Sequence, residues 1–183
     1  MKKYKTRIFL GSLFLIIIFN RESIFCALFS YKIDKKRASH KMRDENIIMI
    51  INENNRYPTT FLSEIINTSQ KCTSEKLNFT FAKCNTDPNL LINYGKTNCI
   101  GYATFATSIC NYLLERQNMK RQWVATPYIA EIYFCDVNIH PFFNSSFFKD
   151  HDIVVIENLI THQKFAFDPS LNDYFGIYKI RLR

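Results

Sequence analysis

The spacing of apolar and polar residues predicts helices in the first half of the chain and strands in the second. The apolar run 47–51 fits a short strand or a helix equally well. Residues 58–60 resemble a helix start, and residues 67–87, rich in Asn, Thr, Ser and Lys, are expected to form a long surface loop. The helix expected between them would bury a face at helical spacing that comprises Phe61, Leu62, Ile65 and Ile66.

The most regular helical pattern begins at Cys99 and ends between residues 115 and 118. Either Thr97 or Asn98 would cap its N-terminus, because both side chains carry an oxygen that accepts from free backbone N–H groups. A shorter helix is expected to open at Asp87–Pro88. The apolar positions of the long helix recur every three or four residues and predict that it is buried: Ile100, Ala103, Ala106, Cys110, Leu113 and Leu114.

Segments rich in aromatic and β-branched residues follow the long helix and predict strands at 122–126, 128–137, 152–156 and 164–167. Helices followed by strands indicate an α+β domain with its N-terminal helices packed on an antiparallel sheet. The length of 183 residues suits one such domain plus an appendage, and the hydrophobic fraction of 47% excludes wholesale disorder. We assign the domain to residues 47–183.

Residues 1–34 have the composition of a targeting or anchoring segment. Basic residues precede an uncharged apolar run at 8–19, which matches a signal-peptide core and is short for a membrane span of about 20 residues. A second apolar patch, 24–31, follows without a clear small-x-small cleavage site. The segment is therefore interpreted as a signal peptide or a membrane anchor, with 8–31 as the tether and the body exported or held outside the cytoplasm. A buried N-terminal helix is the alternative.

The net charge of +8 is unevenly distributed. Residues 1–34 hold six Lys or Arg against two Asp or Glu, and the densest basic cluster follows in 35–46, interpreted as a linker near a membrane. Elsewhere the basic residues lack the interleaved aromatics of a single-strand binding surface, so no nucleic-acid partner is expected. No C-x-x-C pair, phosphate loop or dinucleotide motif occurs, so neither a metal ion nor another cofactor is expected. The oligomeric state is left open.

Of the six cysteines, Cys99 is the one placed for chemistry. It occupies the first turn of the expected helix, where the helix dipole and unpaired N–H groups favour the thiolate, the form that acts as a nucleophile. A structural thiol is the alternative for Cys99, and it is the simpler interpretation for Cys110 and Cys135, which lie in apolar segments. Cys72 and Cys84 enclose a polar stretch and would be able to pair in an oxidising compartment.

The catalytic base would be one of four histidines, and the last hairpin singles out His151. If strand 151–157 pairs antiparallel with 162–168 across a four-residue turn, His151 lies opposite Asp168, with their Cβ atoms about 5 Å apart on one face of the sheet. The aspartate would accept from one imidazole nitrogen and leave the other free for the thiol. This pairing depends on the register, since a slip of one residue would separate the two side chains.

Three segments, taken in order, resemble the transglutaminase-like superfamily: Asn98–Ala103 (NCIGYA), His151 at the head of a strand, and Phe165–Ser170 (FAFDPS). That superfamily has a cysteine followed by Gly-Tyr-Ala or similar at a helix start, then a histidine heading a strand, then an aspartate followed by Pro-Thr or Pro-Ser. The resemblance covers roughly residues 88–175. It implies a papain-like α+β core in which Cys99 is the nucleophile, His151 the base and Asp168 its partner.

The chemistry implied by the resemblance is attack of a thiolate on an amide or ester carbonyl of a peptide or protein, followed by release of the acyl group to water or an amine. Two other hypotheses stay open: a non-catalytic protein-interaction domain on the same scaffold, and a tethered structural protein in which the Cys99 match is accidental. A disulfide at Cys99 would favour the latter. The aromatic loop 140–150 would either line the substrate cleft or pack in the core.

Overall fold

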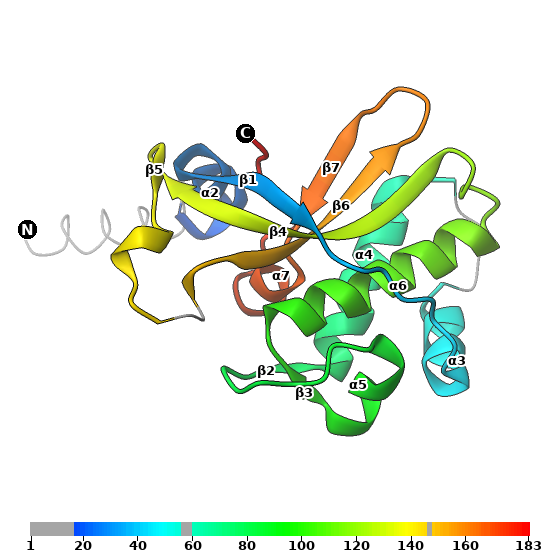
Figure 1. The fold of residues 1–183 in the computed structure, drawn as a ribbon. Coiled ribbons are helices and arrows are strands. Elements are labelled where there is room, and N and C mark those ends of the chain that lie inside the picture. The colour runs from blue at the N-terminus through cyan, green and yellow to red at the C-terminus, as the bar shows by residue number, and fades with distance from the viewer. Residues whose placement is uncertain (1–16, 56–59, 146–147) are drawn as a thin grey trace, which may run out of the picture.

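A computed structural model describes residues 17–55, 60–145 and 148–183, and it shows an α+β protein built on an antiparallel sheet (Figure 1). The strand order is β1-β4-β6-β7, and the short β5 pairs with the end of β4. These strands are β1 (Phe29–Lys36), β4 (Trp123–Phe134), β5 (Val137–Asn138), β6 (His151–Asn158) and β7 (Lys164–Phe167). A separate parallel pair is formed by β2 (Asn78–Phe79) and β3 (Lys96–Thr97). The helices are α2 (Arg21–Leu28), α3 (Glu45–Asn54), α4 (Leu62–Lys76), α5 (Pro88–Tyr94), α6 (Cys99–Arg116), the 3-10 turn η1 (His140–Phe142) and α7 (Pro169–Phe175).

Helix α6 forms the centre of the core. Every residue from Gly101 to Cys110 is buried, because α4 packs on one side of the helix and strands β4 and β6 pack on another. Strand β6 is buried on both faces, with Val154 in the cluster around α6 and Val155 in a second apolar cluster that includes Tyr31. The first residues of α6 and β6, which the sequence singles out for chemistry, therefore stand on rigidly packed elements.

Helix α4 corrects the expectation of a loop at 67–87. The helix continues to Lys76, and Ser69 and Thr73 are buried within it. Their hydroxyls donate to carbonyls of the preceding turn, Ser69 to Ile66 at 2.8 Å and Thr73 to Ser69 at 2.7 Å. Polar composition was a poor guide here, because hydroxyl groups that bond to their own helix can be buried at little cost.

The remaining elements follow the expected pattern with small changes. Residues 47–51 are helical within α3, α5 opens at Pro88, and the Asn98 side chain caps α6 by accepting from two backbone N–H groups. The segment 122–126 and most of 128–137 form the single strand β4, Trp123–Phe134, which passes through Pro127. Proline is tolerated there because its carbonyl accepts from the N–H of Arg37, just beyond the last paired residue of β1, so the missing N–H faces the end of the β1 ladder.

The boundary expected at residue 34 is wrong, because it falls inside β1. This strand pairs antiparallel with β4 from Phe29↔Phe134 to Lys36↔Tyr128 and forms an edge of the sheet. The expected linker 35–46 likewise begins inside β1 and ends inside α3. An apolar patch that resembles part of an export signal, 24–31, thus supplies a strand and the buried side chain of Tyr31 to the fold.

Helix α2 is fastened to the C-terminal segment of the chain. Arg21 Nε donates to the Gly176 carbonyl at 3.1 Å, and Glu22 accepts from the Tyr178 N–H at 2.8 Å. Of the apolar run 8–19, residues 8–16 lie outside the described residues. Across the described ranges, no helix is long and apolar enough to cross a membrane.

Candidate active site

Cys99 is the first residue of α6, as expected, and the local sequence explains its position. The Asn98 side chain accepts from the N–H groups of Ile100 at 3.2 Å and Gly101 at 3.4 Å, which fixes the start of the helix. Gly101 allows the preceding segment to lie against the helix, since a Cβ at this position would stand 1.8 Å from the Thr97 hydroxyl oxygen. The Cys99 sulfur is therefore held at the positive end of the helix dipole.

Asp168 ends β7 and caps α7, and its two carboxylate oxygens have different partners. Oδ1 accepts from the Ser170 N–H at 2.9 Å, the Ser170 hydroxyl at 2.6 Å and the Leu171 N–H at 3.2 Å. Oδ2 contacts His151 Nε2 at 2.6 Å. The helix cap thus orients the carboxylate so that one oxygen faces the imidazole.

His151 contacts the Asp168 carboxylate and is close enough to Cys99 for the thiol to affect its pKa. Its side chain is 19% exposed, and its Nε2 is engaged by Asp168, so Nδ1 is the nitrogen left for Cys99. Burial acts to lower the pKa of His151, but the Asp168 carboxylate and a hydrogen bond with Cys99 outweigh it and raise that pKa well above its ordinary value. Burial likewise acts to raise the pKa of Asp168, yet His151 and the capping donors hold it below its usual range.

The hairpin register differs from the expected one: each residue of β6 pairs with a residue of β7 that lies two positions later in the chain than predicted. The loop has the expected four residues but spans 159–162, and the ladder pairs Glu157 with Lys164 and Val154 with Phe167. Asn158 closes the loop, with its N–H donating to the Gln163 carbonyl. His151 and Asp168 are therefore not directly opposite. They still meet, because a shift of two preserves the face and because Asp168 lies just beyond the last paired residue.

Tyr31, from β1, is a site residue that the sequence did not reveal. It is 1% exposed, and its ring centroid lies 6.3 Å from that of His151. Burial, the charge of Asp168 and a hydrogen bond to its carboxylate raise the pKa of Tyr31 well above the ordinary value. Nothing near Tyr31 in the sequence signals this role, which arises because β1 lies next to β4 in the sheet.

We expect Tyr31→Phe to lower the free energy of unfolding by about 1.5 kcal/mol, because it removes a buried donor to an ionised carboxylate. Chemical denaturation of the wild type and the variant measures the change. Tyr133→Phe is a matched control, since its hydroxyl donates to Glu131 at 3.0 Å on a partly exposed strand. The control should change stability by less than about 0.5 kcal/mol. Equal effects of the two changes would contradict a special role for Tyr31.

A buried ion pair flanks the same site. Arg37 binds the Asp152 carboxylate with two nitrogens, Nε to Oδ1 and Nη2 to Oδ2 at 3.0 Å, and the Asp152 side chain is fully buried. The hydrogen bond to Asp152 is the main cause of a raised Arg37 pKa. The segment expected to be a linker therefore supplies the cation of this buried pair.

The other cysteines differ from Cys99 in setting. All those described are free thiols, so Cys72 and Cys84 are not paired with each other. Burial raises the pKa of Cys72 to about 11 and that of Cys110 to about 12, which suits structural thiols. Cys135 corrects the expectation of a buried strand position, because it is exposed in the turn between β4 and β5.

The loop 140–150 is anchored by a buried histidine rather than by its phenylalanines. His140 Nε2 accepts from the Ile132 N–H at 2.7 Å, and Nδ1 contacts the Phe148 carbonyl at 2.5 Å. Phe142, Phe143 and Phe148 are exposed, so packing in the main core does not explain them. The Phe148 ring instead lies 6.3 Å from Phe81, across from the loop that follows β2.

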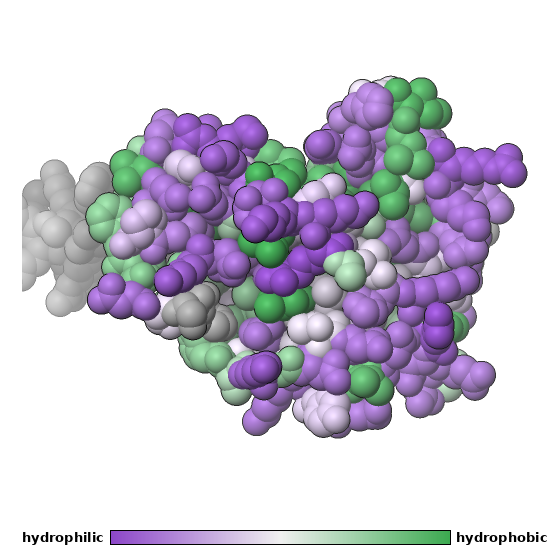
Figure 2. Space-filling model, viewed as in Figure 1, coloured by the Kyte–Doolittle hydropathy of each residue, from purple (hydrophilic) through white to green (hydrophobic). Residues whose placement is uncertain are grey.

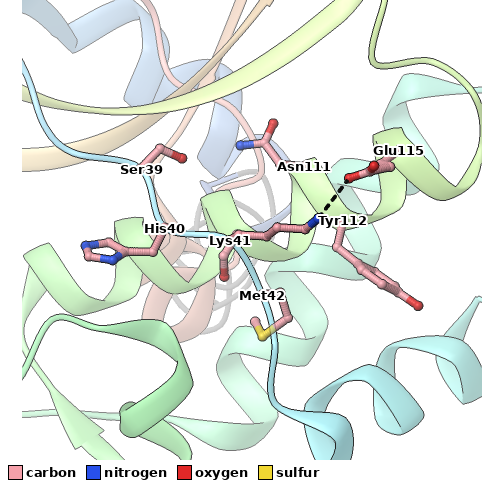
Figure 3. A pocket seen from close by; sticks show the side chains of 8 residues that line it. Ser39, His40, Lys41, Met42, Asn111, Tyr112 and Glu115 are labelled. Carbon is pink, nitrogen blue, oxygen red and sulfur yellow. Dashed lines mark ion pairs between the residues drawn. The ribbon is translucent and has the colours of Figure 1, made fainter.

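A hollow of about 250 Å³ lies between the segment 39–42 and α6 (Figure 3). Its polar groups are engaged with the protein: Asn111 bonds to both the N–H and the carbonyl of Ala125, and Lys41 pairs with Glu115 at 4.0 Å. None of the residues Cys99, His151 and Asp168 lines it, and within the described part of the chain none of its lining residues hydrogen-bonds to one of these three. This hollow is therefore separate from the candidate site.

Comparison with known proteins identifies no relative: no protein-family model, curated protein or solved structure matches the chain. Among the described residues, no group of three or more His, Cys, Asp or Glu is placed to hold a metal ion. The function therefore has to be argued from the geometry of Cys99, His151 and Asp168.

Proposed function

We propose that this protein is a thiol-dependent acyl-transfer enzyme of the peptidase, amidase or transglutaminase type, with a papain-like core similar to the transglutaminase-like superfamily. Cys99 acts as nucleophile, His151 as base and Asp168 as the group that orients the base. The observation that carries the proposal is the 2.6 Å contact between His151 Nε2 and Asp168 Oδ2, with Cys99, at the start of α6, close enough to the same imidazole to help raise its pKa.

The steps follow from which nitrogen is free. Asp168 holds the Nε2 proton, so Nδ1 accepts the proton of the Cys99 thiol. The thiolate attacks an amide or ester carbonyl, and a C–S bond forms as the C–N or C–O bond breaks. Nδ1 returns the proton to the departing amine or alcohol, and water or an acceptor amine then releases the acyl group with the base acting again.

The backbone of the first α6 turn offers a donor to the carbonyl oxygen. Asn98 occupies the N–H groups of Ile100 and Gly101, whereas the N–H of Cys99 has no hydrogen bond within the described part of the chain. An N–H of the nucleophile itself lies close to the oxyanion that the attack creates, so we assign it as one oxyanion donor.

The substrate is a peptide or protein, and the body is held outside the cytoplasm near a membrane. Support for the location comes from exposed apolar side chains on α2, on the residues just before it and on the β4–β5 turn. Helix α2 and strand β5 lie side by side (Figure 1), and hydrophobic residues are exposed at that end of the molecule (Figure 2). The exposed residues are Ile17, Ile18, Phe19, Ile24, Leu28, Phe134 and Val137. Exposed apolar side chains of this kind suit contact with lipid, and positions 1–34 of the sequence hold six basic residues.

The experiment that tests the chemistry is alkylation of Cys99 by iodoacetamide between pH 5 and 9, on the full chain. Mass spectrometry of the Cys99 peptide separates its rate from that of the exposed Cys135. We expect fast modification that persists below about pH 7 and falls at least tenfold in His151→Gln, because the imidazolium that stabilises the thiolate is lost.

His162→Gln is the matched control, since His162 also contacts a carboxylate, Glu157 at 3.1 Å, but stands in an exposed turn. The control should leave the Cys99 rate unchanged. If Cys99 reacts like a free cysteine, with its rate falling steadily below about pH 8.5, and ignores the change at His151, the enzyme proposal is wrong.

A further inference from the structure

An aromatic hollow of about 390 Å³ opens between the loop after β2 and helix α7. Among the described residues, no charged side chain lines it, and Ser170 is the one lining residue without an aromatic ring or aliphatic side chain. Its lining comprises Phe79, Phe81, Ser170, Leu171, Tyr174 and Phe175. We call this the aromatic hollow.

The aromatic hollow adjoins the candidate site from two directions. On the α7 side, Ser170 donates its hydroxyl to Asp168 at 2.6 Å, and the Leu171 N–H donates to the same oxygen. On the α6 side, Phe79 pairs with Thr97, two residues before Cys99, and its ring lies 6.0 Å from that of Tyr102, one turn after Cys99. Groups that hold the nucleophile and the orienting carboxylate thus also form the walls of the hollow.

The exposure of these rings points to an apolar ligand. Phe81, Tyr174 and Phe175 are 70%, 54% and 64% exposed, although large aromatic side chains gain most from burial. Three of them around one concave surface form a patch of the kind that marks a binding site. A charged ligand would find no opposite charge among the described lining residues, whose polar side-chain groups are the Ser170 hydroxyl, which donates to Asp168, and the Tyr174 hydroxyl, which accepts from the Phe79 N–H.

The walls are also held in place before any ligand arrives. The Tyr174 hydroxyl accepts from the Phe79 N–H at 2.9 Å, which joins α7 to β2 across the hollow. Behind it, the Tyr102 hydroxyl donates to Asp173 at 2.6 Å and contacts the Leu77 carbonyl at 2.9 Å. A preformed apolar surface loses little conformational freedom on binding, which favours tight and selective contact.

We infer that the aromatic hollow binds an aromatic or large aliphatic group of the substrate, next to the carbonyl that Cys99 attacks. The inference rests on the proposed function and deepens it, since it names the substrate class: peptides or acyl compounds with an apolar group beside the reacting bond. Charged groups at the same place are disfavoured, because they would lose water without gaining a partner.

Three alkylating probes that differ in their amide substituent test this on the full chain. They are iodoacetamide, which has none, N-(2-phenylethyl)iodoacetamide, which has an aromatic one, and N-(2-carboxyethyl)iodoacetamide, which has a charged one. The thiol attacks the iodine-bearing carbon of each probe, and the amide substituent is then free to rotate toward the hollow. We expect the phenylethyl probe to alkylate Cys99 at least tenfold faster than iodoacetamide, with a rate that saturates, because burying a phenyl group contributes about one to two powers of ten in binding. The carboxyethyl probe should be no faster than iodoacetamide.

Phe175→Glu should reduce the ratio of the phenylethyl rate to the iodoacetamide rate to about one, the value for a probe that has no binding site. Phe175 is suited to this change because it is exposed at the last position of α7. Ile160→Glu is the matched control, since Ile160 is an exposed apolar residue in the β6–β7 turn, at the opposite end of β6 from His151. The control should keep the wild-type ratio.

The outcomes separate this inference from the proposed function. If Cys99 reacts with iodoacetamide in a His151-dependent way but shows no preference for the phenylethyl probe, the hollow is not a substrate site while the enzyme proposal stands. An equal loss of the ratio in both glutamate variants would also overturn the inference. The alternative occupant of the hollow is a second copy of the chain, and sedimentation of the wild type and Phe175→Glu tests it. A dimer that the variant dissociates would assign the hollow to that second copy.

Discussion

Asp168→Asn is expected to lower the free energy of unfolding by about 3 kcal/mol near pH 5.5, the scale of effect seen when one partner of a buried ion pair is removed. The substitution keeps an oxygen that can accept from Ser170 and Leu171, so the cap of α7 is preserved. It removes the negative charge that His151 contacts at 2.6 Å in a buried setting. The loss therefore reports the charge interaction rather than the helix cap.

The effect should depend on pH in a defined way. The pKa of Asp168 is lowered in the folded state, so its contribution is present above about pH 4 and is lost as the pH falls through the folded value. The pKa of His151 is raised, so its contribution is complete below about pH 6.5 and is lost as the pH rises through the folded value. The stability difference between wild type and Asp168→Asn should thus be largest between about pH 4 and 6.5 and decline on both sides.

Denaturant titrations at a series of pH values measure this profile, and NMR of the imidazole resonances follows His151 directly. In Asp168→Asn the pKa of His151 should fall, because burial remains while the main opposing charge is gone. Glu157→Gln offers a matched control, since it removes a carboxylate that pairs with His162 at the surface. That change should cost less than about 0.5 kcal/mol. A flat pH profile for Asp168→Asn would contradict the assigned ion pair.

Gly101→Ala should also lower the free energy of unfolding by about 3 kcal/mol, at the upper end of what overpacking costs. The added Cβ would stand 1.8 Å from the Thr97 hydroxyl oxygen and 2.7 Å from its Cβ. Neither side can yield easily, because Thr97 is fully buried and its backbone carbonyl accepts from the Thr80 N–H at 2.8 Å. The clash would push the segment before Cys99 away from α6, so the alkylation rate of Cys99 should fall as well.

A double-mutant cycle identifies the contact responsible. Thr97→Gly removes the atoms that the new methyl group meets, so the double variant should recover at least about 1 kcal/mol relative to Gly101→Ala alone. Thermal and chemical denaturation of the four proteins give the coupling free energy. Additive effects, with no recovery in the double variant, would show that Gly101 is needed for some other reason than its approach to Thr97.

The last hairpin shows how much of the site could be predicted from the sequence, and why. The aromatic and β-branched residues of 152–156 and 164–167 predicted two strands, and an assumed four-residue turn between 151–157 and 162–168 placed His151 opposite Asp168. The turn lies one residue later than expected, because Asn158 closes it through bonds from its side chain to the N–H groups of Ile160 and Thr161. Such a local preference is not visible in hydrophobic periodicity, so the exact pairing was missed while the face was retained.

Helix α6, the short helix α5 and the strand β7 were determined by the sequence alone, because each depends on contacts within a few residues or on a regular apolar period. For the cap of α6 the sequence left Thr97 and Asn98 as alternatives, and the structure has Asn98. The tertiary structure decided the rest. It placed Tyr31 beside His151, paired Arg37 with the buried Asp152, and set Phe79 across from Tyr174 to form the aromatic hollow. These contacts join segments more than ninety positions apart, so no local pattern encodes them, and they exist only once the sheet and the helices have packed together.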